Sequence, residues 1–529
     1  MEINCFGKTY YMNKKNNRNI ANRIFILFVF LASTWLFVAA AGFTGARAGT
    51  DIRVGLKALY SGKSIITIYN TEIKMGYCLN DSYKADIILK SAGGFSFEPD
   101  RSAYYTNADS FASYTDAYNV LKNSGKKGIV CYAGRSKWMV YLKNMEDDKA
   151  YAKVSSSHVI KLTFGRQTLL IDGSISGAYP QFAPSGKETR LSLGSRSYRG
   201  RIEIGRYGSE AITAVNIVNI ESYLLSVVSC EISSTWHSEV QKAQAIAARS
   251  YCLAYTGFSA DSNINKGYEI VDTDESQVYA GAEKETDSSR YAVKTTLKKV
   301  LKSGGKVLPA YYFSTSGGAT EFSSDIWGGN NSSFIGVFDE YETNPERAPW
   351  TIKTTFTELE QKLNNKGYKV SNITEIYPEL LSDSGRVSSV KIRHDGGTLS
   401  LKGSIIKSLY NMASTKYKII TADSEDFEVY VKSRDDMEDV SAGELSIISG
   451  TGQISEAKKE TDQLVVISSD NMTNFPVSRP GANDIWFLGM GSGHGIGMSQ
   501  SGAYGMAMKG YKFDEILKYY YNDIEISFY

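Results

Sequence analysis

The spacing of apolar residues changes near residue 220, and this change limits the fold more than any other feature of the sequence. Residues 151–220 alternate apolar and polar side chains in short runs such as HVIKLTF and ITAVNIVNI, separated by Gly and Ser turns. This alternation is typical of strands with one buried face. From Glu221 to Tyr255 the spacing becomes helical. Strand runs interspersed with helices predict an α+β fold rather than a regular βαβ winding.

The helical stretch divides into two helices. The first carries IESYLLSVVS, a break follows at 233–235, and the second carries SEVQKAQAIAARSYCLAY. Ser238 is the expected N-cap of the second helix, and Gly257 is its expected C′ residue. The small residues of the second helix allow another element to pack closely against it.

Other elements follow from the same patterns. A helix is expected at TDAYNVLKNSG, closed by Gly125, and a strand pair is expected around a turn at Gly134. This helix and aromatic strand pair weakly resemble the SPOR modules that bind peptidoglycan glycan; a small α+β insertion without a ligand is the equal alternative. Further along, we expect helices at 355–368 and 404–412, strands at 387–393 and 398–402, and loops with short edge strands over 422–480.

The N-terminus has the composition of an export signal. Residues 1–23 carry five Lys and Arg against Glu2, and an apolar or small run of 20 residues, Ile24–Phe43, follows before Ala46-Arg47-Ala48. A basic start, an apolar core and a small-x-small site describe a signal peptide, yet the run is also long enough to span a bilayer. Either way, the positive charge predicts that residues 49–529 lie outside the cytoplasmic membrane.

Charge and cysteine content narrow the function further. Without residues 1–48 the chain holds 53 Lys and Arg against 56 Asp and Glu, so nothing indicates nucleic-acid binding. Four cysteines remain, with Cys78 and Cys131 as a candidate disulfide pair, but a chain of this size does not need a disulfide framework. The four His of the chain and the absence of a C-x-x-C pair supply a zinc cage poorly.

Glu231 is the first candidate for chemistry. It follows an apolar run at the break between the two helices, flanked by Val, Cys, Ile and Trp236. Desolvation in such a setting raises the pKa of a carboxyl group, as a general acid for glycoside cleavage requires. The alternative is a carboxylate that caps the second helix.

Lys242 and Arg249 lie seven residues apart on the second helix and therefore share a face, whereas Gln244 and Ser250 lie on other faces. The face with the two cations is either a solvated charged stripe or the wall of a groove that holds polar substrate groups.

The remaining candidate site residues lie in two loops. Glycines on both sides of His494 allow close approach of the backbone to a ligand or another segment, or a tight structural turn. The segment lacks the lysine of a phosphate loop, which excludes nucleotide binding of that type. In YYFSTSGG, Tyr312, Ser314 and Ser316 have no G-x-S-x-G elbow, so a structural or substrate-lining loop is favoured over a serine nucleophile.

Seven blocks in order resemble the SpoIID/LytB family, which contains stage II sporulation protein D and the amidase enhancers. They cover residues from about 195 to 529: YRGRIEI, VNIVNIESYLLSVVSCEISSTW, KAQAIAARSY, SQVYAG, YYFSTSGGAT, GRVSSVKI and GSGHGIGMSQSGAYGMAMKGYKFDEILKYYY. The resemblance implies a lytic transglycosylase acting on glycan strands from which an amidase has removed the stem peptides.

The resemblance also assigns residues. The catalytic glutamate of the family falls on Glu231, and its supporting lysine and arginine fall on Lys242 and Arg249. Within the matching blocks we assign substrate contacts to Gln277, Tyr312, Ser314, His494 and Gln500. Some members hold zinc with His and Cys just before the SQVY block; YEIVDTDESQVY has neither, so no metal and no other cofactor is expected.

The expected protein is thus an extracytoplasmic α+β enzyme of the cell wall with a substrate groove, a membrane segment or signal at 1–48, a small α+β region at 49–150 and a catalytic domain at 151–529. Expected partners are peptidoglycan glycan strands, an N-acetylmuramoyl-L-alanine amidase and sporulation membrane proteins, without nucleic acid. A non-catalytic amidase enhancer or cell-wall-binding protein is the alternative.

Overall fold

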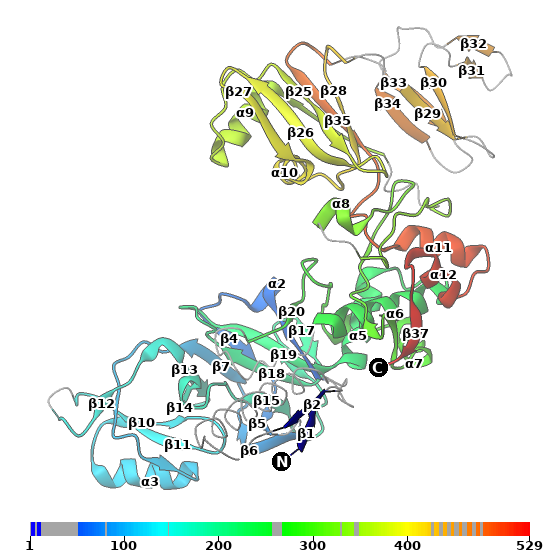
Figure 1. Cartoon of the computed structure of the whole chain (residues 1–529). Coiled ribbons are helices and arrows are strands. Elements are labelled where there is room, and N and C mark those ends of the chain that lie inside the picture. The colour runs from blue at the N-terminus through cyan, green and yellow to red at the C-terminus, as the bar shows by residue number, and fades with distance from the viewer. Residues whose placement is uncertain are drawn as a thin grey trace. The chain divides into compact units, whose positions relative to one another are not determined.

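The computed structural model describes residues 51–79, 82–145, 148–255, 267–327, 331–342, 349–424 and 480–529, with short strands within 2–11 and 428–476 (Figure 1). The chain divides into two units, Met1–Thr50 and Asp51–Tyr529. In the first, β1 (Glu2–Cys5) pairs with β2 (Lys8–Tyr11). The predicted signal or membrane segment at 24–43 lies outside the described residues. Among the helices that are described, none has the length and apolar character to cross a membrane.

A seven-stranded sheet lies beside the predicted helix pair. Its interior strand β19 is buried at six of its seven residues, which is typical of a strand covered on both faces. Val215 of β19 faces Gly55 of β3 in the register. In spatial order the strands are β20 (Ile270–Val271), β3 (Asp51–Gly55), β19 (Thr213–Asn219), β18 (Arg201–Gly205), β15 (Gln181–Pro184), β5 (Glu72–Leu79) and β6 (Ser82–Lys90).

A second, larger sheet contains the predicted helix and strand pair of the N-terminal region. Helix α3 (Tyr114–Ser124) ends at Gly125, whose φ of 65° lies in the left-handed region that favours glycine. The helix contacts β10 and β11. The turn between these two strands contains Gly134, with φ of 85°. The strands are β12 (Ala152–Lys153), β8 (Tyr105–Thr106), β11 (Trp138–Leu142), β10 (Gly128–Tyr132), β14 (Gln167–Asp172), β13 (Val159–Phe164), β7 (Phe95–Pro99), β4 (Ile66–Ile68), β16 (Leu191–Leu193) and β17 (Arg196–Tyr198), with β9 (Ser110–Phe111) on β11.

Strands from both sides of residue 150 share these sheets. Cys131 of β10 pairs with Leu170 of β14, and Leu162 of β13 pairs with Phe97 of β7. The predicted domain boundary at 150 therefore does not coincide with a break in the sheet, although the SPOR-like interpretation of 114–142 stays a prediction.

The predicted helix pair is present. Asn219 caps α5 (Ile220–Glu231) by accepting a hydrogen bond from the backbone of Glu221. The second helix is α6 (Ser238–Tyr255). The predicted N-cap at Ser238 is wrong, because Ser238 is the first helical residue and His237 caps the helix: its Nδ1 accepts the Glu239 N–H at 3.3 Å. Gly257 lies outside the described residues.

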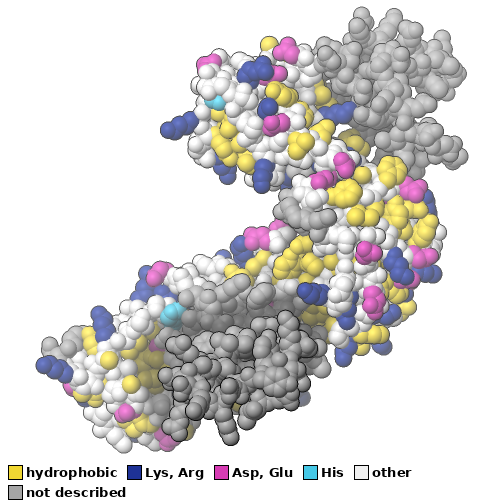
Figure 2. Space-filling model, viewed as in Figure 1, with side chains coloured by type: hydrophobic (Ala, Val, Ile, Leu, Met, Phe, Trp, Pro, Cys, Tyr) yellow, Lys and Arg dark blue, Asp and Glu magenta, His cyan; other side chains and the backbone are white. Residues whose placement is uncertain are grey.

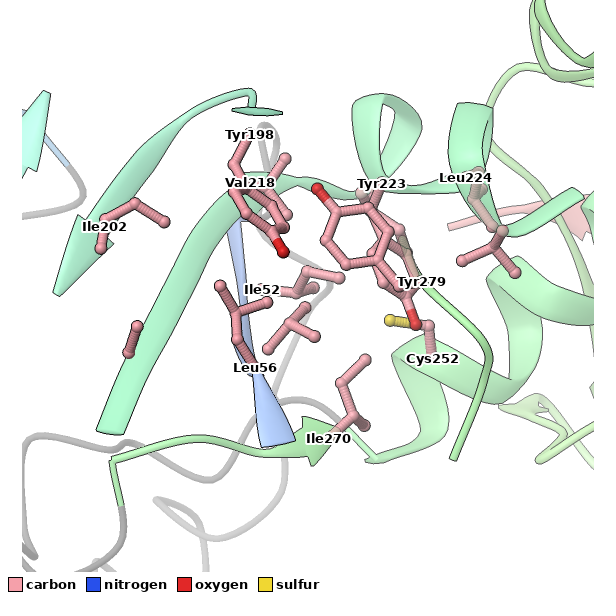
Figure 3. Close-up of a cluster of buried hydrophobic side chains, with 14 of the residues drawn as sticks. Ile52, Leu56, Tyr198, Ile202, Val218, Tyr223, Leu224, Cys252, Ile270 and Tyr279 are labelled. Atoms are coloured by element: carbon pink, nitrogen blue, oxygen red, sulfur yellow. The ribbon is translucent and has the colours of Figure 1, made fainter. Parts of the chain in front are cut away.

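Apolar packing joins these helices to the seven-stranded sheet. Tyr223 of α5 and Cys252 of α6 lie with Ile52 and Val218 of the sheet in one buried cluster (Figure 3). Further elements surround the pair: α7 (Asp287–Thr295), β21 (Lys299–Ser303), β22 (Lys306–Val307), β23 (Tyr312–Phe313), β36 (Met498–Ser499), α11 (Gln500–Met508), α12 (Phe513–Tyr520) and β37 (Glu525–Phe528).

The segment between the two candidate loops has its own apolar core, which includes Leu359, Val390 and Phe487. The helices and strands predicted there are confirmed. They are β24 (Trp350–Thr355), α9 (Phe356–Asn365), β25 (Glu375–Leu381), β26 (Val387–His394), β27 (Gly397–Lys402), α10 (Gly403–Leu409), β28 (Tyr417–Ile420) and β35 (Asp484–Gly489). Within 422–480 the structure describes three hairpins, formed by β29 (Glu428–Lys432) and β30 (Met437–Ser441), β31 (Ser446–Ile448) and β32 (Ile454–Glu456), and β33 (Gln463–Ile467) and β34 (Met472–Pro476).

The α+β class is confirmed. Cys78, Cys131, Cys230 and Cys252 form no disulfide in the structure, so the candidate pair of Cys78 and Cys131 is wrong. On the face drawn in Figure 2, acidic and basic side chains are interspersed over the described surface. A pocket lies where β5 and β15 approach the β10–β11 turn, lined by residues that include Tyr77, Arg135 and Gln181, and none of its lining residues is a predicted site residue.

Candidate functional site

Glu231, the last residue of α5, has its two carboxyl oxygens held by different segments. The Val278 N–H donates to Oε1 at 2.8 Å, and the Gln500 side-chain amide lies 3.5 Å from Oε2. The Tyr312 hydroxyl also hydrogen-bonds the carboxyl group. Glu231 itself is only partly buried. The site therefore joins α5, the loop at 278, β23 and α11 around the carboxyl group of one partly buried residue.

The surroundings of Glu231 favour its protonated form. Burial raises its pKa above the ordinary value, and the negative charge of Asp274 acts in the same direction. The hydrogen bonds from Val278, Gln500 and Tyr312 oppose this shift without cancelling it. The raised pKa predicted from the apolar flanks is confirmed in direction.

Gln277 places the Tyr312 hydroxyl. Its Nε2 donates to the Tyr312 oxygen at 2.9 Å and to the Ala248 carbonyl at 3.3 Å, while its Oε1 accepts from Tyr223 at 3.3 Å. Gln277 is 1% exposed. Gln277 is therefore a buried amide that fixes Tyr312, which in turn donates to Glu231. A substrate contact by Gln277 stays a prediction.

His494 also acts on the Tyr312 segment. Its Nδ1 accepts the Ile496 N–H at 3.1 Å, so its Nε2 carries the proton and donates to the Tyr312 carbonyl at 3.1 Å. Burial and the charge of Arg386 lower its pKa to about 4. At neutral pH His494 is thus an uncharged residue that holds the backbone of β23.

This environment predicts a pH dependence of stability. In the unfolded chain a histidine takes up a proton near pH 6.5, whereas folded His494 does so only near pH 4. The stability that His494 contributes is therefore complete above pH 6.5 and is lost as the pH falls from 6.5 towards 4. Urea unfolding of the wild type and of His494→Asn across this range should show a flatter pH dependence in the variant. NMR titration of the His494 ring near pH 6.5 in the folded protein would contradict the assignment.

The glycines around His494 allow the close approach that the sequence predicts. A Cβ on Gly495 would lie 2.7 Å from Arg386 Nε, and the φ of this residue is 88°. Arg386 is fully buried, and its Nη2 donates to the Ser316 carbonyl at 2.9 Å. One guanidinium therefore packs against both candidate loops. The Ser314 carbonyl accepts the Ser501 N–H at 3.0 Å, and a substrate contact of the Ser314 side chain stays a prediction.

Lys242 and Arg249 do share a face of α6, but this face turns towards protein. Lys242 pairs with Glu239 at 2.7 Å and lies over the ring of Tyr291 in α7. Arg249 has no exposed surface; its Nε and Nη2 contact Glu221 at 2.9 and 2.7 Å, and its Nη1 donates to the Lys299 carbonyl. These contacts give Arg249 a structural role, and a substrate contact by Arg249 stays a prediction.

Sequence reasoning missed other parts of the site. Gln244, which was assigned to another face, lies fully buried with its Oε1 3.5 Å from the Gln500 amide nitrogen. Val278 contributes its backbone N–H, and a contact of this kind cannot be predicted from the type of side chain. The helical spacing opposite Lys242 was the signal that could have identified Gln244. Within the described ranges, no three His, Cys, Asp or Glu side chains are arranged to hold a metal ion.

Comparisons with known proteins give a family match that includes part of this site. Residues 208–302, which contain Glu231 and Gln277, match the SpoIID family described as stage II sporulation protein. Stage II sporulation protein D of Bacillus subtilis is 25% identical over 325 residues, 59% of this chain and 76% of that protein. The family match and this relative support the resemblance to the SpoIID/LytB family that the sequence blocks indicate.

Two further relatives show how far the SpoIID/LytB likeness extends. An uncharacterised protein of Brachyspira hyodysenteriae is 26% identical over 385 residues, 72% of this chain and 87% of the relative. The amidase enhancer of Bacillus subtilis is 28% identical over 348 residues, 64% of this chain, but the match covers only 45% of the enhancer. The chain thus spans less than half the length of that relative.

Proposed function

We propose that this protein is a peptidoglycan lytic transglycosylase that cleaves peptide-free glycan strands. The observation that carries the proposal is the environment of Glu231. This partly buried residue has a carboxyl group with a raised pKa, and Val278 and Gln500 contact its two oxygens. A general acid needs this combination of protonation and fixed orientation.

The reaction needs one carboxyl group from the protein. Glu231 donates its proton to the oxygen that leaves the muramic acid anomeric carbon, and the bond between that carbon and oxygen breaks. The 6-hydroxyl of the same sugar then attacks the carbon, while the Glu231 carboxylate accepts the hydroxyl proton. The product ends in 1,6-anhydromuramic acid, and no water is consumed.

The neighbours of Glu231 support both steps. Donors on its two oxygens stabilise the carboxylate that exists between the proton transfers, and Tyr312 supplies one of these hydrogen bonds. Gln277 and His494 act through Tyr312, by its hydroxyl and its carbonyl respectively. They are positioning residues under this proposal, as distinct from the catalytic Glu231.

The product identifies the reaction. The purified chain, incubated with peptide-free strands in ¹⁸O-labelled water, should release fragments with unlabelled anhydro ends, as measured by mass spectrometry. Reducing ends that carry ¹⁸O would indicate hydrolysis and would exclude the transglycosylase mechanism.

Asp274 offers a test for a second carboxylate. Conventional glycosidases use two carboxyl groups, and the Asp274 charge acts on Glu231. If Asp274 acts only at a distance, Asp274→Asn keeps the anhydro product and shifts the high-pH limb of the rate profile to lower pH, because the pKa of Glu231 falls. Loss of cleavage by two orders of magnitude or more, the range of a general acid or base, would assign Asp274 a direct role.

The proposal includes a location. The basic N-terminus and the apolar run of Ile24–Phe43 support export across the cytoplasmic membrane, where the substrate lies. A cell-wall amidase is then the partner that prepares the substrate. N-terminal sequencing of the mature protein distinguishes a cleaved signal, with a start at Gly49, from a retained anchor.

A non-catalytic amidase enhancer is the second candidate, supported by the name of the Bacillus subtilis relative. The two functions separate in one assay. An enzyme cleaves peptide-free strands without added amidase, whereas an enhancer increases the rate of a purified amidase and leaves the strands intact.

A further inference from the structure

One face of α6 runs past Glu231. Gln244 on this face approaches the Gln500 amide that contacts Glu231, and the Ala248 carbonyl, one turn later, accepts from Gln277. Tyr251 and Tyr255 follow at the next two turns, since residues spaced by three or four lie on the same side of a helix. From Gln244 to Tyr255 the face extends about 16 Å along the helix axis.

The end of this face carries a cluster of three tyrosines. The rings of Tyr251 and Tyr255 lie 4.8 Å apart, and those of Tyr251 and Tyr311 lie 5.8 Å apart at 72°. The Tyr255 and Tyr311 hydroxyls hydrogen-bond each other. Tyr255 is 37% exposed, so part of its ring is open to solvent although its neighbours fix its orientation.

The cluster is electrostatically and spatially linked to the site. Burial raises the pKa of Tyr251 to about 12, and the negative charge of Glu231 makes a smaller contribution in the same direction. Tyr311 lies edge-on to the His494 ring at 6.1 Å and directly precedes Tyr312. Tyr311 therefore borders the segment that donates to Glu231, and Tyr251 lies close enough to respond to the Glu231 charge.

We propose that Tyr251, Tyr255 and Tyr311 form a sugar-binding subsite for the glycan strand, which rests on the proposed function. A pyranose ring has an apolar C–H face and a hydroxyl edge. Rigid tyrosine rings match this surface, because each combines an apolar face with a polar tip. The subsite holds a sugar beside the reacting linkage and so favours strands over short fragments.

Binding measured without cleavage tests the subsite. In a Glu231→Gln background, calorimetry with peptide-free strands and with β-1,4-linked N-acetylglucosamine oligomers reports affinity alone. Tyr255→Ala should weaken binding roughly three- to tenfold, the range for one aromatic contact. Tyr255→Phe, which keeps the ring, should bind within about twofold of its parent.

Tyr69→Ala is the matched control, because Tyr69 is 59% exposed and belongs to another part of the chain. It should bind like the parent. Unchanged affinity in Tyr255→Ala would overturn the subsite, even if wild type cleaves strands. Conversely, a wild type that binds through Tyr255 but never cleaves would refute the transglycosylase and leave the subsite in place.

Discussion

Glu231→Gln should lower the rate of glycan cleavage by about 10²–10⁴-fold, the contribution of a positioned acid and base. The amide keeps an oxygen for the Val278 N–H, so the fold is expected to persist. The amide has no acidic proton to transfer to a leaving oxygen and is too weak a base to accept one from the 6-hydroxyl. Mass-spectrometric counting of anhydro ends over time measures the loss.

The cleavage rate of the wild type should also depend on pH. The acid step requires protonated Glu231, and burial raises the pKa of this residue. The rate should therefore decline as the pH rises through that raised pKa, and Glu231→Gln should lose this limb. Glu275→Gln is the matched control, since Glu275 is exposed and pairs with Lys57. Full anhydro product from Glu231→Gln would exclude Glu231 as the acid.

The sequence identified Glu231 because its signal is local. Apolar neighbours on both sides and a helix break at 233–235 predict desolvation without knowledge of the tertiary fold. The structure then adds what is non-local, namely donors from Val278 and Gln500, which lie 47 and 269 residues away. No spacing rule connects such distant positions.

The two cations show the limit of periodicity. Helical spacing correctly placed Lys242 and Arg249 on one face of α6, but it does not say which neighbour covers that face. The structure covers it with α7 and β21, and the opposite side, with Gln244 and Tyr251, turns towards Glu231. The charged face is predicted to face substrate because charged side chains are usually exposed. In the structure, the Glu221 carboxylate pairs with the Arg249 guanidinium inside the protein.

The strands were similarly predictable one by one but not in their pairing. Alternation in residues 151–220 indicated strands, and β13 and β14 form there. That β13 pairs with β7, from before residue 150, depends on apolar surfaces that meet only in the folded chain. A domain boundary drawn from local composition therefore crosses a continuous sheet.

Arg249→Met should destabilise the fold by about 3–5 kcal/mol, the usual cost of removing one partner of a buried ion pair. The guanidinium has no exposed surface and makes two contacts with Glu221 and one with the Lys299 carbonyl. Its loss leaves the Glu221 carboxylate, 18% exposed, without its cation. Urea unfolding of the full chain measures the change as a lower midpoint.

Comparing Arg249→Met with Lys242→Met distinguishes a structural role of Arg249 from a role in substrate binding. Lys242→Met removes a pair in which the lysine is 15% exposed, and Glu239 keeps the Phe513 N–H as a second donor, so it should cost less than Arg249→Met. Replacing Glu221 together with Arg249 by apolar residues should recover part of the lost stability, because no buried charge then lacks its partner. If Arg249→Met instead unfolds at the wild-type midpoint but loses affinity for glycan strands, the arginine contacts substrate and the cation face of α6 must open during binding.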